Sequence, residues 1–166
     1  MLYVGHSWNG CSASVNHNGF NCLKAIDGIT SVFANGWAYN VLGTSSWAIF
    51  DLTEKRKMNT IVMKLFVRTR NYLDVLLIFR VNLIVDGQSI NLTGLKVQEY
   101  PSAIIDGDGT VTLATVNGNS PVLHLEFNTV SNVQSIRLDM TKTNWPPGGQ
   151  LLLLHEIIPK FEHRED

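Results

Sequence analysis

Two tryptophans stand in polar, loop-like segments, Trp37 within residues 35–40 and Trp145 within residues 143–149. An aromatic ring beside an asparagine can stack on the apolar C–H face of a sugar, while the amide bonds its hydroxyl groups. The alternative is that such rings cap the open end of a β-sandwich. We therefore name Trp145 and its neighbour Asn144 as candidate ligand-binding residues, and Trp37 as either a wall of the same site or a ring that caps the end of the sandwich.

Arg68 and Arg70 form a second group of candidates. They are two positions apart, so both project from the same face where an apolar strand ends. Asn71 and Tyr72 follow in the turn and complete the group. A pair of guanidinium groups can bind neighbouring hydroxyls or a carboxylate. The alternative is a solvated strand face shared with Lys64.

The composition argues against several classes of protein. The chain has 13 Lys and Arg against 14 Asp and Glu, which gives no reason to expect a nucleic acid or an anionic membrane as partner. It contains no run of 18 apolar residues, so we expect no transmembrane segment. It has no GxSxG, HExxH or glycine-rich phosphate loop, and its histidines lack metal-ligand spacing, so we expect no enzyme.

The composition also bears on location. Few charges and many Asn, Ser, Thr and Gly are common in secreted β-proteins, and we expect an extracellular or secreted location.

The elements that would position these residues are short β-strands. Asn-Gly and Asp-Gly turn signals separate apolar runs, a pattern typical of an all-β sandwich or barrel. The clearest strand is 60–70, where apolar and polar residues alternate. Another begins at Trp47, whose ring we expect in the core, and a helical turn or two is expected around residues 23–26. The other predicted strands are 47–52, 76–85, 110–116, 122–127, 133–141 and 151–161.

Cys11 and Cys22 are the two cysteines of the chain, so at most one internal bridge can form. Both flank one Asn- and Gly-rich segment, and a local disulfide is expected if the protein matures in an oxidising compartment. Otherwise two reduced, buried thiols are expected. The length of 166 residues, with no linker or repeat, predicts a single domain over residues 1–166.

The order of seven short motifs resembles the discoidin family, also called coagulation-factor type C domains, and the related galactose-binding-like carbohydrate-binding modules. The match spans residues 9–161, and it departs from many extracellular members in having no cysteine near the C-terminus. The motifs are a Ser-rich opening at 11–14, Ala-Ile-Asp-Gly at 25–28, a Trp-containing strand at 47–52, an apolar strand ending in Arg at 61–70, a strand running into Asp-Gly at 79–87, Ile-Arg-Leu at 136–138 and Leu-His-Glu-Ile at 154–157.

The resemblance implies a jelly-roll β-sandwich of about eight antiparallel strands, galactose-binding-domain-like, with ligand loops at one end. It implies a non-catalytic, lectin-like carbohydrate-binding module with a glycan as partner, which fits as one part of a larger multidomain protein. It also brings the loops 35–40, 70–74 and 143–149 together. A galactose-type sugar is the first expectation, because its axial hydroxyl leaves a continuous apolar face for stacking. An acidic sugar is the second, because two guanidinium groups can pair its carboxylate.

Two other functions remain open at this point, a phospholipid- or membrane-surface-binding discoidin domain and a protein-interaction module. The predicted loops hold few Lys or Arg, which favours a sugar over an anionic lipid surface.

The resemblance also implies a structural Ca²⁺ at the turn that contains Asp27. Many carbohydrate-binding relatives hold such an ion with this Asp, a nearby carbonyl, a hydroxyl and the Glu of the last strand. Here Asp27, Glu156 and the carbonyl of Lys24 match by position, and Thr30 or Ser31 can supply the hydroxyl. Such a turn offers the carbonyl and carboxylate oxygens that Ca²⁺ prefers. The alternative is an empty turn in which Asp27 caps backbone amides.

Overall fold

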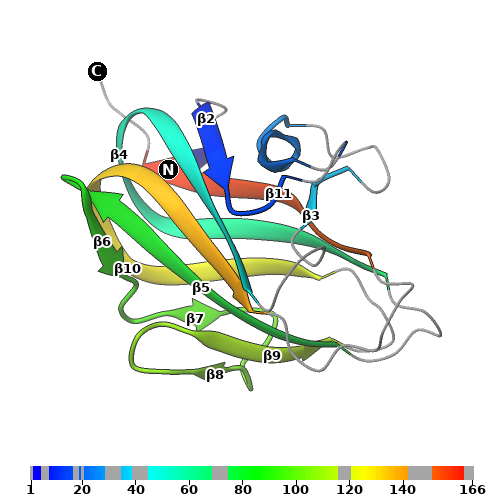
Figure 1. Ribbon diagram of the computed structural model, residues 1–166. Helices are drawn as coiled ribbons and strands as arrows, with labels where there is room; N and C mark the ends of the chain where they lie inside the picture. Colours follow the sequence, from blue (N-terminus) through cyan, green and yellow to red (C-terminus); the bar gives the residue numbers. More distant parts are fainter. Residues whose placement is uncertain are drawn as a thin grey trace.

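Two long strands bend and pass through both layers of a β-sandwich (Figure 1). The computed structural model describes residues 2–4, 8–16, 19, 21–28, 35–38, 45–68, 75–115, 121–141 and 151–162. The elements are β1 (Leu2–Val4), β2 (Trp8–Ala13), the 3₁₀ turn η1 (Cys22–Ala25), β3 (Trp37–Ala38), β4 (Ser45–Arg68), β5 (Val75–Val85), β6 (Gln88–Asn91), β7 (Lys96–Val97), β8 (Ile104–Ile105), β9 (Val111–Thr115), β10 (Val122–Thr141) and β11 (Leu151–Glu162).

The first layer is centred on the C-terminal arm of β4, residues 58–68. This arm lies between β11 and the N-terminal arm of β10, residues 122–130. Met63 marks this centre, because it stands opposite Leu123 on one side and Ile157 on the other. β1 and β3 extend the layer beyond β11, and β7 extends it beyond β10.

The second layer is formed around the N-terminal arm of β4, residues 45–52. This arm lies between β2 and the C-terminal arm of β10, residues 135–141. Phe50 stands opposite Cys11 on β2 and Ile136 on β10. β5, β9 and β8 follow in that order, and β6 forms a hairpin with β5. All strand pairs of the described residues are antiparallel, as expected for a jelly-roll sandwich.

The core lies between the two layers. Met63, Leu123 and Ile157 of the first layer are at most 1% exposed, and so are Phe50 and Ile136 of the second. Burying one such side chain contributes about 1.5–3 kcal/mol of transfer free energy. The alternation of buried and exposed residues along each arm therefore holds the two layers face to face.

The predicted all-β fold is confirmed, with one difference in how the strands join. The predicted strands 47–52 and 60–70 are parts of one strand, β4, and 122–127 and 133–141 are parts of β10. The charged stretch 53–57, which lies between the two predicted strands, continues β4 around the bend between the layers. The helical turn expected around residues 23–26 is η1.

Candidate functional site

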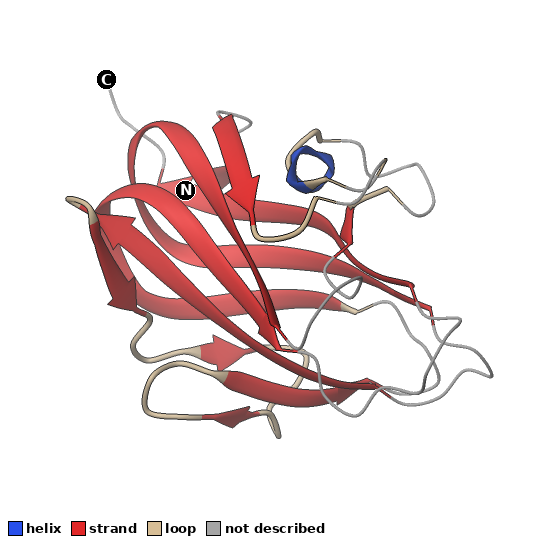
Figure 2. Ribbon diagram, viewed as in Figure 1, coloured by secondary structure: helices blue, strands red, loops and turns tan. Residues whose placement is uncertain are grey.

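Several strands that border the predicted ligand loops end at one end of the sandwich (Figure 2). Arg68, the last residue of β4, stands opposite Leu151, the first of β11. Ser45 at the start of β4 stands opposite Thr141 at the end of β10. In a bent antiparallel strand both free ends point the same way, so these two pairs lie at the same end of the molecule. The strand ends that flank the predicted loops 70–74 and 143–149 therefore lie at one end of the sandwich, while the loops themselves stay a prediction.

Most of the predicted ligand-binding side chains lie outside the described residues. This applies to Arg70, Asn71, Tyr72, Asn144 and Trp145. The backbone of Arg68 is described as the last residue of β4, while nothing is stated about its side chain. The roles of these residues stay predictions.

Trp37 is a core residue, and its predicted role as a wall of the ligand site is wrong. Its side chain is 0% exposed, and the indole N–H donates a hydrogen bond to the Val15 carbonyl at 2.7 Å. The physical reason is the close approach of β3 to β11, where Trp37 stands opposite Leu154. A Cβ at Gly36 would lie 2.5 Å from the Leu154 carbonyl oxygen, so this glycine permits the contact that turns the ring inward.

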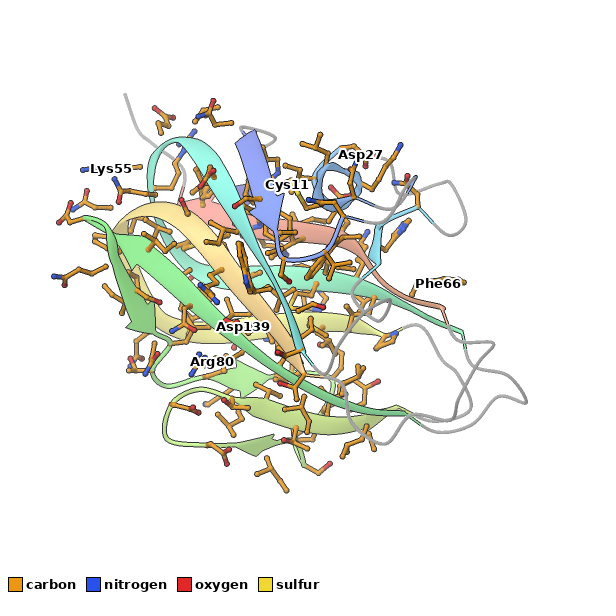
Figure 3. The ribbon with its side chains drawn as sticks, viewed as in Figure 1. Cys11, Asp27, Lys55, Phe66, Arg80 and Asp139 are labelled. Carbon is orange, nitrogen blue, oxygen red and sulfur yellow. A yellow bond between two sulfur atoms is a disulfide. The ribbon has the colours of Figure 1, made fainter. Side chains whose placement is uncertain are left out.

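Trp47 lies on the outside of the sandwich, although its ring was expected in the core. We expected its ring in the core, but Ser46 and Ala48 beside it are buried and Trp47 is half-buried on the outer face of the second layer. The Arg137 guanidinium lies over its ring, 5.1 Å from the centroid. Asp139 holds this guanidinium through hydrogen bonds of 3.0 and 3.1 Å. Figure 3 shows Asp139 on this face.

The turn after η1 brings several oxygen atoms together. The Asn35 amide nitrogen lies 3.3 Å from the Lys24 carbonyl oxygen, and 3.1 and 3.3 Å from the two carboxylate oxygens of Asp27. The Gly28 backbone N–H donates to Glu156 Oε1 at 3.1 Å. Residues that are far apart in the sequence therefore meet at one corner of the sandwich, where Figure 3 labels Asp27.

Glu156 is buried at this corner, with its side chain aimed toward the turn from β11. The residue is 3% exposed, and its Oε2 has no hydrogen-bond partner. Burial raises the pKa of Glu156 to about 7; the negative charge of Asp27 adds to the rise, while the Gly28 N–H and Lys64 oppose it. A buried carboxyl group with one unpartnered oxygen is costly unless a proton or a cation compensates it.

This donor set fits a hard cation such as Ca²⁺. Lys24 offers a carbonyl oxygen, and Asp27 and Glu156 offer carboxylate oxygens, which are the ligand types that Ca²⁺ takes. Thr30, the predicted hydroxyl ligand, lies outside the described residues. Among the described residues, no group of three His, Cys, Asp or Glu side chains gathers around one point. A cation here would therefore depend on carbonyl oxygens as well as on the two acids.

Cys11 and Cys22 are joined by a disulfide that ties β2 to η1, with their Cα atoms 6.2 Å apart. Cys22 is 4% exposed. Since η1 leads directly into the turn with Asp27, the disulfide fixes one side of this corner against the second layer.

Sequence reasoning missed the part that Asn35 plays in this corner. Asn35 donates to Lys24 and Asp27, and its own carbonyl oxygen is hydrogen-bonded to Nδ1 of His155. The Asn35-Gly36 dipeptide was visible as a turn signal. Its partners on β11 and in the Asp27 turn are distant in sequence, and a turn signal carries no information about them.

Comparisons with known proteins show the fold. No family model matches the chain, and no curated protein matches it. The resemblance to the discoidin family therefore stays a prediction. Among the described residues, no helix is long and apolar enough to cross a membrane.

Similar solved structures include two carbohydrate-binding modules. Chitosan-binding module 1 of a chitosanase/glucanase from Paenibacillus sp. IK-5 has a TM-score of 0.55 at 16% identity, over 92% of this chain and 94% of that module. A pectin-binding carbohydrate-binding module has a TM-score of 0.58 at 18% identity, over 96% and 91% of the two chains. A truncated AlyQ with CBM32 and alginate lyase domains has a TM-score of 0.58 at 16% identity, over 99% of this chain but 34% of that one. The chain thus shares the β-sandwich of such modules.

Proposed function

We propose that this protein is a non-catalytic carbohydrate-binding module. The observation that carries the proposal is the sandwich itself, whose strands β4, β10 and β11 end together at the border of the predicted ligand loops. Its likeness to chitosan-binding and pectin-binding modules over most of their length supports the same function. The disulfide between Cys11 and Cys22 supports an extracellular or secreted location, because disulfides persist in oxidising compartments.

The proposed site binds a galactose-type or acidic sugar at this end of the sandwich. Trp145 stacks on the apolar face of the sugar and excludes water from it. Arg70 and Asn144 bond adjacent hydroxyls, and they discriminate because a missing hydroxyl would leave them without a partner. Arg68 with Arg70 pairs the carboxylate of a uronate, while Asn71 and Tyr72 border the sugar in the turn that follows.

A glycan array tests the proposal, with isothermal titration of the best ligand as the second step. We expect binding of a single sugar with a Kd of roughly 0.1–1 mM, because few contacts must offset the lost freedom of the ligand. Binding to liposomes in place of glycans would overturn the proposal in favour of the phospholipid function.

The variant Trp145→Ala should lose most of this binding while its melting temperature stays within about 2–4 °C of the wild type, as expected for a loop residue. The matched control is Trp145→Phe, which keeps an aromatic face and should retain most of the affinity. Unfolding of the Ala variant, or undiminished binding by it, would show that the ring serves the core instead.

We further propose a structural Ca²⁺ at the Asp27 corner, held by Asp27, Glu156, the Lys24 carbonyl and Thr30. The unpartnered Oε2 of buried Glu156 supports this proposal. The ion would supply positive charge between two carboxylates and would stabilise the turn that leads away from η1.

Thermal unfolding in calcium and in chelator tests the ion. At a calcium concentration of about 100 Kd the folded state gains about 2.7 kcal/mol, or roughly 5–10 °C in melting temperature. The gain should vanish in Asp27→Asn and persist in Asp86→Asn, an exposed aspartate on the β5–β6 turn. A melting temperature that ignores both calcium and chelator would refute the ion.

A further inference from the structure

A pocket of about 450 Å³ lies at one edge of the sandwich, where the two layers meet. β7 borders the pocket from the first layer, and β8 borders it from the second. Residues 98–103 carry the chain from one layer to the other (Figure 1). The volume falls within the range of roughly 300–1,000 Å³ that is usual for small-ligand sites.

The crossing segment is fixed by hydrogen bonds, so the pocket is preformed. The Tyr100 N–H donates to the Val97 carbonyl at 3.1 Å, and the Ala103 N–H donates to the Tyr100 carbonyl at 3.0 Å. Glu99 fastens the segment to β10, since its carboxylate accepts from the His124 backbone N–H at 2.6 Å and lies 2.7 Å from the His124 ring Nδ1. A preformed site loses little conformational entropy when a ligand binds.

The lining of the pocket combines apolar surface with three polar side chains. Leu95 and Ile105 are half-buried and supply apolar surface, while Val97 beside them is 3% exposed and belongs to the core.

The polar side chains are Lys96, Gln98 and Glu126. The Gln98 amide donates to the Glu126 carboxylate. Lys96 stands opposite Glu126 in the pairing of β7 with β10, so the two charges of opposite sign are neighbours.

We infer that this edge pocket is a second saccharide-binding site, separate from the loop site and taking one sugar unit of a glycan. The inference rests on the proposed function. Tyr100 is among the residues that line the pocket, and a tyrosine ring can offer an apolar face to the C–H side of a sugar. Beyond their mutual bond, Gln98 keeps a donor and an acceptor, Glu126 keeps acceptors and Lys96 offers donors to hydroxyl groups.

The polar groups also decide which class of ligand fits. A wholly apolar ligand would leave Gln98 and Glu126 desolvated without new partners, which is costly. One positive and one negative side chain give the pocket no net preference for a charged ligand, so a neutral sugar fits it best. A second site on one chain would raise avidity for a polysaccharide without any new contact at the first.

A two-dimensional NMR titration of the ¹⁵N-labelled protein tests the inference, with galactose, galacturonic acid and chitotriose as separate probes. The Gln98 side-chain amide and the backbone amides of 96–100 report on the edge pocket. We expect galactose, the neutral probe, to shift these signals in a saturable way and the two charged probes to shift them less. Gln98→Ala and Glu126→Gln should each weaken that binding by roughly tenfold or more. Trp145→Ala and the exposed control Gln88→Ala should leave it within about twofold.

The outcomes separate the two sites. If a glycan binds elsewhere on the protein while none of the three probes moves the Gln98 signals, the edge site is wrong and the carbohydrate-binding function stands. If neither the array nor the titration detects binding, the proposed function is wrong as well. If the edge signals move but Gln98→Ala and Glu126→Gln bind as well as the wild type, the pocket residues assigned here do not form the site.

Discussion

Burial and charge act together on Glu156. Its carboxyl group is buried beside the Asp27 turn with one unpartnered oxygen, and burial raises its pKa to about 7 from the ordinary value of 4.5. Between about pH 4.5 and pH 7 the metal-free folded protein therefore holds a proton that the unfolded chain has already released. The proposed cation at this corner would replace that proton, because metal binding requires a deprotonated carboxylate.

The stability of the metal-free protein should therefore depend on the protonation of Glu156. Between about pH 4.5 and pH 7 the unfolded chain ionises at this residue while the folded protein does not, so this contribution to stability falls as the pH rises. Above about pH 7 both states are ionised and the loss is complete, at up to about 3 kcal/mol. Urea unfolding of wild type and Glu156→Gln in chelator, at several pH values, measures the difference. Glu126→Gln, an exposed carboxyl group, is the control and should follow the wild type. A pH-independent difference between wild type and Glu156→Gln would contradict this account.

Motif positions in the sequence predict where Asp27 and Glu156 lie, but the sequence does not predict on which side of a strand an aromatic ring lies. Asp27 and Glu156 follow from motif positions, and the structure brings both to the Gly28 backbone. The side on which a tryptophan lies depends on strand register, and a shift of one residue reverses it. Trp37, for which a ligand role and a packing role were both open, is buried, and Trp47 lies on an outer face instead of in the core.

At the scale of elements, alternation predicts the strands but not how they connect. The alternating residues of 60–68 belong to β4 as expected. The bends of β4 and β10 are set by packing between layers, and in β10 they appear as register shifts from Glu126 to Ser135 and as Asn132 with a φ of +59°. β7 and β8 have two residues each and are defined by their partners, so periodicity could not reveal them or the pocket that they border.

The disulfide between β2 and η1 should stabilise the corner that holds the Asp27 turn. It closes a short loop, because its cysteines are 11 positions apart, and the reduced entropy of the unfolded chain is worth roughly 3 kcal/mol. Replacing both cysteines by alanine should lower the melting temperature by about 6–12 °C. Reducing agent should lower the melting temperature of the wild type similarly and leave the double variant unchanged. Two alkylatable thiols in the protein from its native compartment would show that the bridge does not form there.

At the scale of the whole molecule, the shared strands make the two layers one structure. β4 and β10 each contribute one arm to each layer, and their mutual pairing runs through both. A ligand site at the strand ends therefore rests on a framework in which neither layer can shift without bending these strands. Such a framework holds the strand ends at fixed spacing, which suits a binding module that must present its groups to a ligand without reorganising.

This shared framework predicts cooperative unfolding, and Met58 provides the test. Met58 is 0% exposed next to the bend of β4, opposite Val130 of β10 and Phe161 of β11. Met58→Ala should cost about 2–5 kcal/mol, because it leaves a cavity where the layers join. Native-state hydrogen exchange should then show the same loss of protection for the slowest amides of β11 in the first layer and β5 in the second. The control Ile104→Ala, at a side chain 64% exposed on edge strand β8, should leave both layers unchanged. Retention of full protection in β5 while β11 loses it would mean that the layers open separately, and the bent strands would then act as hinges instead of a common frame.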